Sequence, residues 1–369
     1  MEIIHLILGK ANPERMNGVN KVVYQMATRQ ANAGKKIAVW GITKDLTHNY
    51  GERNFKTLLF QAHKNPFKID TELKKALIQN KKEIVVHLHG GWVPIYASLA
   101  RFLSKNNIPF VLTPHGAYNT IAMQRSGISK KLYFLLFEKF LLKKVNRIHS
   151  LGESEVVGLN QLFPNSKSFL LPYGYEVPNN ITINKVPSEK FIIGFVGRLD
   201  IYTKGLDLLI DAFTQFSSKI EQTELWIVGD SKERIELEHL IEKNHIQKKV
   251  KLFGSKFGNE KDEIISQMTI FTHPSRNEGI PTAVIEASVI GIPSVVTHAT
   301  NIAGFINQYN AGIAIQDENV SELVSGFEKL YKIWKTEEMT AISENAKNMV
   351  KEVFNWNTIV DKLDELYQI

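Results

Sequence analysis

Short apolar runs alternate with longer amphipathic stretches from one end of the chain to the other. The apolar runs are rich in Val, Ile and Phe and show little polar alternation, as expected for strands covered on both faces. Such strands, alternating with helices, favour an α/β fold with parallel, doubly wound sheets. The predicted strands are residues 2–8, 36–42, 84–89, 109–113, 191–196, 224–228, 250–253, 270–273 and 293–297. The predicted helices are residues 19–33, 93–105, 206–217, 234–243 and 282–289.

A break in this pattern divides the chain. Residues 172–187 are rich in proline, glycine and asparagine, which interrupt helices and strands, and a new buried-strand pattern starts at Phe191. The length of 369 residues also fits two domains. We therefore predict two Rossmann-like domains, residues 1–173 and 188–354, joined by a linker over residues 174–187. Ligands of such sheets bind beyond the carboxyl ends of the strands, so we expect both domains to face an inter-domain cleft.

Composition narrows the classes of partner. The net charge of +7 and the pI near 9.2 suit phosphorylated ligands, nucleic acid or an anionic membrane surface. No basic run is interleaved with aromatic residues, so we do not expect a nucleic-acid partner. The absence of cysteine excludes disulfides and thiolate metal sites and favours a reducing cytoplasm. No signal-peptide pattern and no apolar stretch of about 18 residues is found, so we expect a cytoplasmic protein.

The segment 273–293 carries the strongest pattern of candidate chemistry, and it predicts a strand, a loop, a helix, a turn and a strand. Gly279 lets the backbone come close to a ligand. Pro281 suits the first position of the helix, where its missing N–H costs nothing. The N–H of Ile280 would then point toward an anion near the helix N-terminus, where the helix dipole favours negative charge.

Two carboxylates flank this helix start. Glu278 precedes the predicted helix and Glu286 lies within it, so the two could contact different hydroxyl groups of one long polar ligand. The alternative is that Glu286 is a solvated helix residue and that Glu278 is a carboxylate favoured by the helix dipole. Spacing alone leaves both interpretations open.

Two cations follow the first strand of the second half. Arg198 comes directly after Gly197 at the end of the strand, and Lys204 precedes the next helix. Fixed cations at this place could stabilise the charge that develops on a departing diphosphate. The alternative is that both are solvated surface cations.

The first half contributes a histidine and a glycine. His115 follows the strand at 109–113 and could bind a sugar hydroxyl or orient an acceptor, or simply be a hydrogen-bonded capping residue. His89 ends the preceding strand, and we expect it to shape the loop rather than to catalyse. Gly18 opens the first helix and would let main chain approach a ligand. Without an Asp-x-Asp pair or metal-ligand spacing, we expect no metal and no other cofactor.

Together, these segments resemble glycosyltransferase family 4, a group of retaining enzymes with the GT-B fold. The resemblance covers nearly the whole chain. It rests on Glu278 and Glu286 in their Pro-Ser-x-x-Glu-Gly-x-Pro setting, on the Gly-Arg…Lys-Gly element and on the Pro-His-Gly element. Residues 355–369 also resemble the last helix of the family, which crosses back onto the first domain. Where many relatives have Pro-Asn-Gly, this chain has Pro-Tyr173-Gly.

The resemblance implies a substrate and a role for each candidate. The donor would be a nucleotide diphosphate sugar, and the acceptor a glycan or a lipid-linked molecule that receives a hexose or an N-acetylhexosamine. Arg198 and Lys204 would hold the diphosphate, Glu278 would meet the sugar hydroxyls, and His115 would sit near the reactive face of the sugar. The other donor contacts implied by the resemblance are Gly18, Gly279, Ile280 and Glu286.

Residues 128–148 predict a strongly apolar helix with several lysines. Such a helix could lie on an anionic bilayer, although a domain helix with its lysines in water is the alternative that we favour. Our hypothesis is that the enzyme builds a bacterial surface polysaccharide, with peripheral contact at the inner face of the plasma membrane. Two other functions stay open, since fold does not fix function: a nucleotide-sugar epimerase and a non-catalytic nucleotide-sugar binding subunit.

Overall fold

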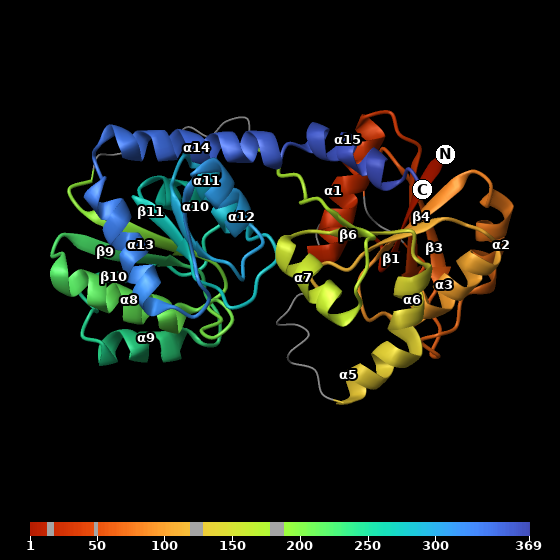
Figure 1. The fold of residues 1–369 in the computed structure, drawn as a ribbon, viewed down its shortest axis with the longest axis horizontal. Coiled ribbons are helices and arrows are strands. Elements are labelled where there is room, and N and C mark those ends of the chain that lie inside the picture. Colours follow the sequence, from red (N-terminus) through yellow and green to blue (C-terminus); the bar gives the residue numbers. More distant parts are fainter. Residues whose placement is uncertain (13–17, 48–50, 119–127, 178–187) are drawn as a thin grey trace. The chain divides into compact units, whose positions relative to one another are not determined.

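In the computed structural model, the described residues are 1–12, 18–47, 51–118, 128–177 and 188–369. They form two compact units (Figure 1). Unit 1 comprises Met1–Gly174 together with Trp356–Ile369, and unit 2 comprises Tyr175–Asn355. Residues 178–187 of the predicted linker lie outside the described residues. Within the described ranges, no helix has the length and hydrophobicity to span a bilayer.

Unit 1 is built on a seven-stranded sheet in the order β3-β2-β1-β4-β5-β6-β7. Every strand pairs in parallel with its neighbours. The chain winds outward from β1 in one direction and from β4 in the other, so the sheet is doubly wound. Its strands are β1 Glu2–Leu8, β2 Ile37–Thr43, β3 Lys56–Gln61, β4 Ile84–His89, β5 Phe110–Thr113, β6 Arg147–Ser150 and β7 Ser168–Leu170.

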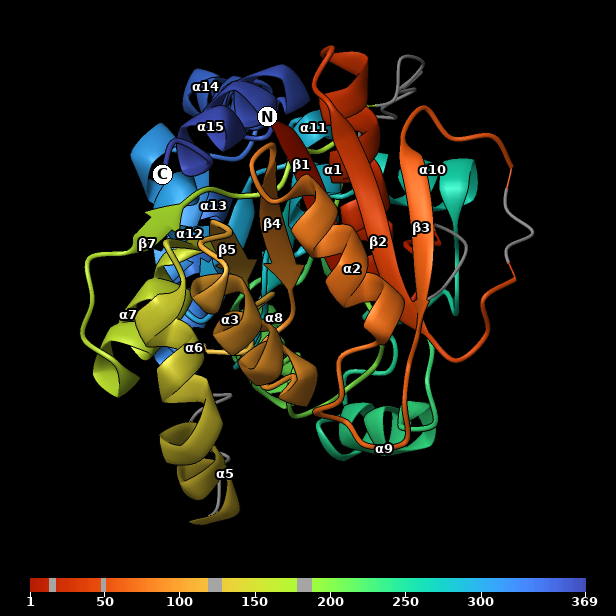
Figure 2. The ribbon, with the colours of Figure 1, turned by 90° about the vertical axis from the view of Figure 1, so that its right-hand side faces the viewer.

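Helices cover both faces of this sheet because side chains alternate along each strand. On β1, Ile4 and Leu6 point into a core that α2, α3, α6 and α7 complete, and Figure 2 shows α2 and α3 in front of the strands. Ile3 and Ile7 point to the opposite core, which α1 and α15 close. The helices are α1 Gly18–Asn32, α2 Thr71–Asn80, α3 Pro94–Lys105, α5 Ile128–Tyr133, the π-helix η1 Phe134–Glu138, α6 Lys139–Lys144, α7 Glu153–Leu162 and α15 Trp356–Leu366.

Unit 2 repeats the plan with a six-stranded sheet in the order β10-β9-β8-β11-β12-β13. Its strands also pair in parallel, and the winding direction changes between β8 and β11. The strands are β8 Phe191–Val196, β9 Thr223–Val228, β10 Val250–Leu252, β11 Ile270–His273, β12 Ser294–Thr297 and β13 Gly312–Ile315.

Two hydrophobic cores flank the second sheet. Phe191, Ile193 and Phe195 of β8 join the core beneath α8, α9 and α13, whereas Ile192 and Val196 join the core beneath α10, α11 and α12. The helices are α8 Leu206–Lys219, α9 Arg234–Lys243, α10 Gly258–Ser266, α11 Thr282–Ile290, α12 Ala303–Tyr309, α13 Val320–Lys332 and α14 Glu337–Val353. The predicted α/β class with two doubly wound parallel sheets is confirmed.

The C-terminal helix α15 belongs to unit 1, where it packs beside α1. A Cβ on Gly174 would lie 2.3 Å from the Trp356 ring, so the chain leaves and re-enters unit 1 at packed neighbours. In unit 2, the Tyr175 N–H donates to the Phe354 carbonyl at 2.7 Å. The chain thus crosses between the units at residues 174–175 and again at residues 355–356. The two crossings contact each other once in unit 1, through Gly174 and Trp356, and once in unit 2, through Tyr175 and Phe354.

The predicted helix over residues 128–148 is wrong at its C-terminal end. The helical turns stop at Lys144, Val145 is extended, and Arg147 begins strand β6. A π-helical turn, η1, also interrupts the segment. The apolar positions of β6 continue the helical spacing of the preceding turns, which hid the strand from pattern analysis.

Candidate functional site

Lys204 and Glu278 form an ion pair at the carboxyl edge of the second sheet. Lys204 lies in the loop that follows β8, and Glu278 lies in the loop that follows β11. These two strands are neighbours, and the winding direction changes between them, which is where open α/β sheets bind ligands. The two side chains are only 16% and 21% exposed. The structure thus pairs two residues that are 74 positions apart in sequence.

The surroundings of Glu278 keep it ionised. Burial alone would raise the pKa of this carboxyl, but contact with His273 and the charge of Lys204 outweigh burial and lower the pKa to about 2. The His273 Nε2 lies 3.6 Å from the Glu278 Oε2, and the His273 ring stacks on Phe195. Because an ionised carboxylate only accepts hydrogen bonds, Glu278 suits hydroxyl groups and not the donation of a proton.

Arg276 ties the two site loops together, and we did not single it out from the sequence. Its backbone N–H donates to the Thr203 carbonyl at 3.0 Å, and its Nη1 donates to the Tyr202 carbonyl at 2.7 Å. Its guanidinium also makes a bidentate pair with Asp207 at 2.8 and 2.7 Å. Bidentate pairs fix direction as well as distance. Arg276 therefore holds the loop of Lys204 against the loop of Glu278.

Gly205 lets these loops approach each other. Its φ of +65° lies in the left-handed region, and a Cβ there would sit 2.1 Å from the Pro274 carbonyl oxygen. No side chain fits that gap without displacing backbone. Gly205 is also the N-cap of α8, so the same residue starts the helix and permits the loop contact.

Arg198 lies near this pair but is not bonded to it. Its side chain is 71% exposed and touches Asp200 at 3.2 Å. Burial would raise the pKa of the Asp200 carboxyl, but hydrogen bonds from Thr203 and then the charges of Arg198 and Lys204 outweigh burial and lower it. The two predicted cations thus flank one carboxylate, with Lys204 fixed and Arg198 largely in solvent.

Glu286 lies in a different group of contacts. Its Oε1 pairs with the Lys261 Nζ of α10 at 2.7 Å. Burial raises the pKa of the nearby Tyr175 phenol, and the charges of Glu286 and Asp262 add to the effect. No contact that the structure records among the described residues joins Glu286 to Lys204 or Glu278. The pairing of Lys261 with Glu286 was not predicted, because the sequence of α10 does not show which other helix its side chains will contact.

Backbone groups complete the loop before α11. The Gly279 carbonyl accepts from the Asn301 N–H at 3.0 Å, which ties this loop to the segment after β12. Pro281 is the N-cap of α11 and not its first helical residue, so that detail of the prediction is wrong. Ile280 precedes Pro281 and packs against the core beneath α11. Pro281 has no side-chain group that could cap the first N–H groups of α11.

In unit 1, Gly18 is the first residue of α1, and its predicted neighbour Asn17 lies outside the described residues. His115 follows β5 in a left-handed conformation with φ +56°. Both of its ring nitrogens contact protein groups, His89 on one side and the Tyr173 hydroxyl on the other. The Glu155 carboxylate fixes this loop, since it accepts from the Gly116 N–H at 2.6 Å.

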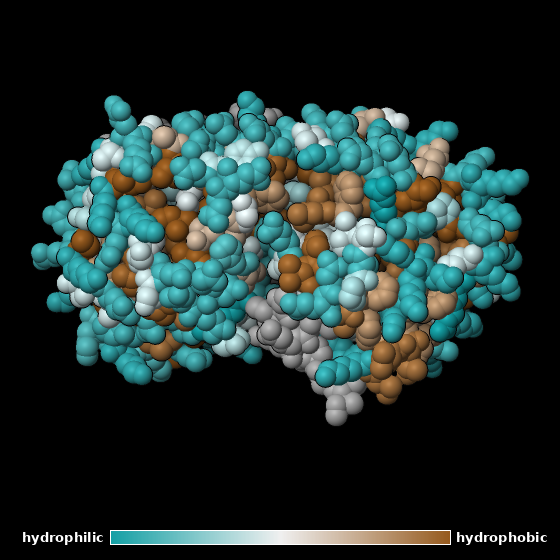
Figure 3. All heavy atoms as spheres, in the orientation of Figure 1, coloured by the Kyte–Doolittle hydropathy of each residue, from teal (hydrophilic) through white to brown (hydrophobic). Residues whose placement is uncertain are grey.

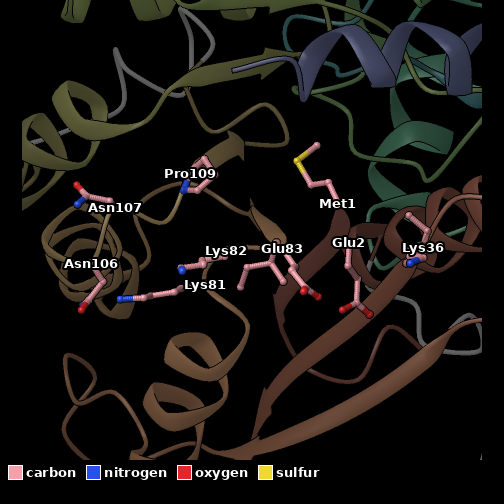
Figure 4. A pocket seen from close by; sticks show the side chains of 11 residues that line it. Met1, Glu2, Lys36, Lys81, Lys82, Glu83, Asn106, Asn107 and Pro109 are labelled. Carbon is pink, nitrogen blue, oxygen red and sulfur yellow. The ribbon is translucent and has the colours of Figure 1, made fainter.

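A surface hollow of about 1030 Å³ lies elsewhere in unit 1 (Figure 4). It is lined by Glu2, Ile37 and Ile84, which are the first residues of β1, β2 and β4. The hollow is therefore at the amino edge of the sheet, opposite to the edge where such sheets bind ligands. We assign it no role.

Comparison with known proteins identifies the two halves. Residues 16–175 match the family model described as Glycosyltransferase Family 4, and residues 176–349 match the model described as Glycosyl transferases group 1. The chain belongs to the family 4 type of glycosyltransferases. The resemblance predicted from the sequence motifs is thereby confirmed.

Relatives of this glycosyltransferase align along most of its length. It is 22% identical over 372 residues to the phosphatidylinositol N-acetylglucosaminyltransferase GPI3 subunit of Saccharomyces cerevisiae, covering 96% of this chain and 80% of the relative. It is 21% identical to the capsular polysaccharide biosynthesis glycosyltransferase CapM of Staphylococcus aureus, covering 83% and 84%. HepE of Anabaena, solved in complex with UDP, matches with a TM-score of 0.73 at 15% identity, covering 100% and 99%. The fold is GT-B, as predicted.

Proposed function

We propose that this glycosyltransferase moves a sugar from a nucleoside diphosphate sugar to a hydroxyl group of an acceptor, with retention of anomeric configuration. The ion pair of Lys204 and Glu278 at the carboxyl edge of unit 2 carries the proposal. A cation and an ionised carboxylate held side by side suit a ligand that has both phosphate oxygens and sugar hydroxyls. On binding, the Lys204 ammonium would donate to the phosphate oxygens and the Glu278 carboxylate would accept from the sugar hydroxyls, so both groups would stay hydrogen-bonded.

The two cations have different parts in this proposal. Charge grows on the diphosphate as its bond to the sugar breaks, and fixed donors stabilise that charge without reorganisation. Lys204 is such a fixed donor, because the Arg276 and Gly205 contacts define its loop. Arg198 makes one exposed pair at 3.2 Å, a contact worth little in water, so its guanidinium can turn to a phosphate at small cost.

The remaining predicted contacts belong to the same proposal. Glu286 would bind the ribose hydroxyls, with Lys261 keeping its carboxylate in place at 2.7 Å. Gly279 and Ile280 would offer backbone groups to the sugar, and Gly18 would approach the diphosphate or the acceptor. No side chain in this scheme requires a resident metal or cofactor.

A lipid-linked or polysaccharide acceptor is also part of the proposal, since the printed names of relatives refer to phosphatidylinositol and to capsular polysaccharide. The surface of unit 1 supports a lipid environment. Leu132, Leu135 and Leu136, spaced for one helix face, are 56%, 62% and 53% exposed on α5 and η1. Figure 3 shows hydrophobic residues gathered over α5. Lys131 is also exposed there, so the leucines would enter an anionic bilayer while lysine meets its headgroups.

A donor panel tests the proposed activity. The enzyme would be incubated with UDP-, GDP- and ADP-sugars, with and without glycan and lipid-linked acceptors, and nucleoside diphosphate release would be followed. We expect release that depends on the acceptor and a product with the anomeric configuration of the donor by NMR. A new nucleotide sugar formed without acceptor would show an epimerase instead, and binding without turnover would show a non-catalytic subunit.

A further inference from the structure

Five of the eleven histidines lie together in unit 1, four of them buried and His115 partly buried, on the face of the sheet that α1 and α15 cover. They come from adjacent strands or from the loop after one. His5 and His87 are direct neighbours in the pairing of β1 with β4. The five are His5, His87, His89, His115 and His149. Buried imidazoles are costly unless both ring nitrogens are bonded, so the arrangement calls for an account of every nitrogen.

Hydrogen bonds link three of these histidines into one chain that ends at α1. The His115 Nε2 lies 3.0 Å from the His89 Nδ1, and the His89 Nε2 lies 2.9 Å from the His5 Nδ1. The His5 Nε2 lies 2.7 Å from the Gln30 Oε1. At the other end, the Tyr173 hydroxyl contacts the His115 Nδ1.

The last member of the chain sets the direction of every bond. The Gln30 carbonyl oxygen can only accept, so the His5 Nε2 donates, and the His5 Nδ1 of a neutral ring must accept. The His89 Nε2 therefore donates to the His5 Nδ1, and the His89 Nδ1 must accept. The His115 Nε2 in turn donates to the His89 Nδ1, so His115 carries its proton on Nε2 and a lone pair on Nδ1. At its other end, the Gln30 Nε2 makes no hydrogen bond with a described residue, so the direction of the chain follows from the 2.7 Å contact between the Gln30 Oε1 and the His5 Nε2.

Burial keeps the chain neutral near pH 7. It lowers the pKa of His5 to about 4 and that of His115 to about 3, and it lowers the pKa of His89 well below its usual value. The nearby charges of other histidines act in the same direction. A neutral ring with a lone pair attracts a hydroxyl donor and not a phosphate oxygen.

A metal site is the competing account, because His5, His87 and His89 have ligand atoms within 4.8 Å of one another. Their nitrogens are already bonded, however. His87 contacts the Tyr367 hydroxyl at 2.8 Å and the Thr113 Oγ1 at 2.6 Å. The remaining nitrogens of the trio belong to the chain described above. Hydrogen bonding therefore uses every lone pair that a metal would need.

We propose that Gln30, His5 and His89 are positioning residues that hold His115 with its proton on Nε2, so that Nδ1 is reserved for a hydroxyl group of the substrate. In this structure the Tyr173 hydroxyl is hydrogen-bonded to the His115 Nδ1, and the substrate hydroxyl displaces it on binding. The inference rests on the proposed function for the identity of the substrate, but the tautomer itself does not depend on it.

NMR of the enzyme labelled with 15N-histidine tests the tautomer directly. The His115 signals, assigned by their loss in His115→Gln, should show a protonated Nε2 and an unprotonated Nδ1 at pH 7.5. Gln30→Met removes the acceptor at equal length and should give mixed tautomers, whereas Gln30→Glu keeps an acceptor oxygen and should restore the wild-type pattern. Protonated Nδ1 in the wild type, or an unchanged pattern in Gln30→Met, would overturn the proposal.

Thr113→Val is the matched control. It breaks the neighbouring link between His87 and His149 at the same depth, and the hydroxyl that it removes is hydrogen-bonded to no member of the chain. The His115 tautomer should be unchanged in this variant. A change as large as that in Gln30→Met would mean that packing and not the chain sets the tautomer, which would contradict the proposal.

Kinetics test the reserved lone pair. Tyr173→Phe removes the competing hydroxyl, so KM for the substrate bound at His115 should fall roughly 3- to 10-fold while kcat changes little. Gln30→Met should raise that KM by a similar factor, and Gln30→Glu should reverse the rise. A raised KM in Tyr173→Phe would contradict displacement. If the wild type transferred no sugar, the proposed function would fail while the NMR result still decided the tautomer.

Discussion

At the scale of single residues, the site is defined by contacts that sequence patterns show only in part. Lys204 and Glu278 could be selected because each follows a recognisable buried strand in a loop with suitable chemistry. Arg276 and Asp207 could not, since an arginine in a polar loop gives no sign that it will pair with a residue 69 positions away. The proposed tautomer of His115 depends in the same way on His89, His5 and Gln30, which no local sequence pattern connects.

Gly205→Ala tests the contact between the two site loops. The new Cβ would meet the Pro274 oxygen at 2.1 Å, and the left-handed φ adds strain, so we expect a loss of about 2–4 kcal/mol in the stability of unit 2. Gly258→Ala is the matched control in the same unit, because Gly258 has φ +53° with nothing within 4 Å of a new Cβ. It should cost only about 1–2 kcal/mol. Equal losses in chemical denaturation would contradict the close-contact account.

At the scale of elements, the burial of each strand determines whether it could be predicted from the sequence. Strands β1, β4, β8 and β11 were predicted with their observed bounds because they are central and almost continuously apolar. Strands β3, β7 and β13 were missed, since each lies at a sheet edge and is largely only partly buried, which weakens the pattern. Strand β6 was missed because it continues the helical spacing of α6.

The segment from α5 to α6 leads to a prediction about membranes. Leu135→Ser with Leu136→Ser should weaken binding to anionic vesicles by at least about 30-fold in co-sedimentation, because about 1–2 kcal/mol of apolar burial is lost at each exposed leucine. Both side chains face solvent, so the fold should persist. Ile235→Ser is the control, since Ile235 is 66% exposed on α9 in unit 2. Equal binding of the wild type to anionic and neutral vesicles would rule out the proposed contact.

At the scale of the whole molecule, the two units share a plan but differ in their titratable cores. Among the described residues, desolvation lowers the pKa of five histidines in unit 1 but of one histidine, His273, in unit 2. A histidine with a lowered folded pKa stabilises the fold above pH 6.5, and that stability is lost as the pH falls toward the folded pKa. The units should therefore differ in their resistance to acid.

We predict that unit 1 unfolds first on acidification. Below the ordinary histidine pKa of about 6.5, each of these five histidines takes up a proton more readily in the unfolded chain than in the fold, so each destabilises unit 1 as the pH falls. Glu138 and Glu155 act oppositely, because burial raises their pKa values, to about 7 for Glu155. Five histidines against two carboxyl groups leave a net loss of stability in unit 1.

Circular dichroism and histidine NMR between pH 8 and 4 would follow this loss. Signals of unit 1 should disappear before those of unit 2, with the change beginning below about pH 6.5. Glu278 should contribute only at the acid end of this range, since the stability that comes from its lowered pKa is lost only below about pH 4.5. Simultaneous unfolding of both units, or a unit 1 that stays stable at pH 4, would contradict the buried neutral histidines.

The affinity for nucleoside diphosphates tests the central claim that the Lys204 and Glu278 pair marks the donor site. Calorimetric titration of UDP, GDP and ADP into the wild type would select the preferred nucleotide, which would then be titrated into Lys204→Met. We predict at least 10-fold weaker binding, because a charge-assisted bond to phosphate is lost. Lys219→Met, at an exposed lysine paired with Glu328 in the same unit, should bind like the wild type. Unchanged affinity in Lys204→Met would contradict the account.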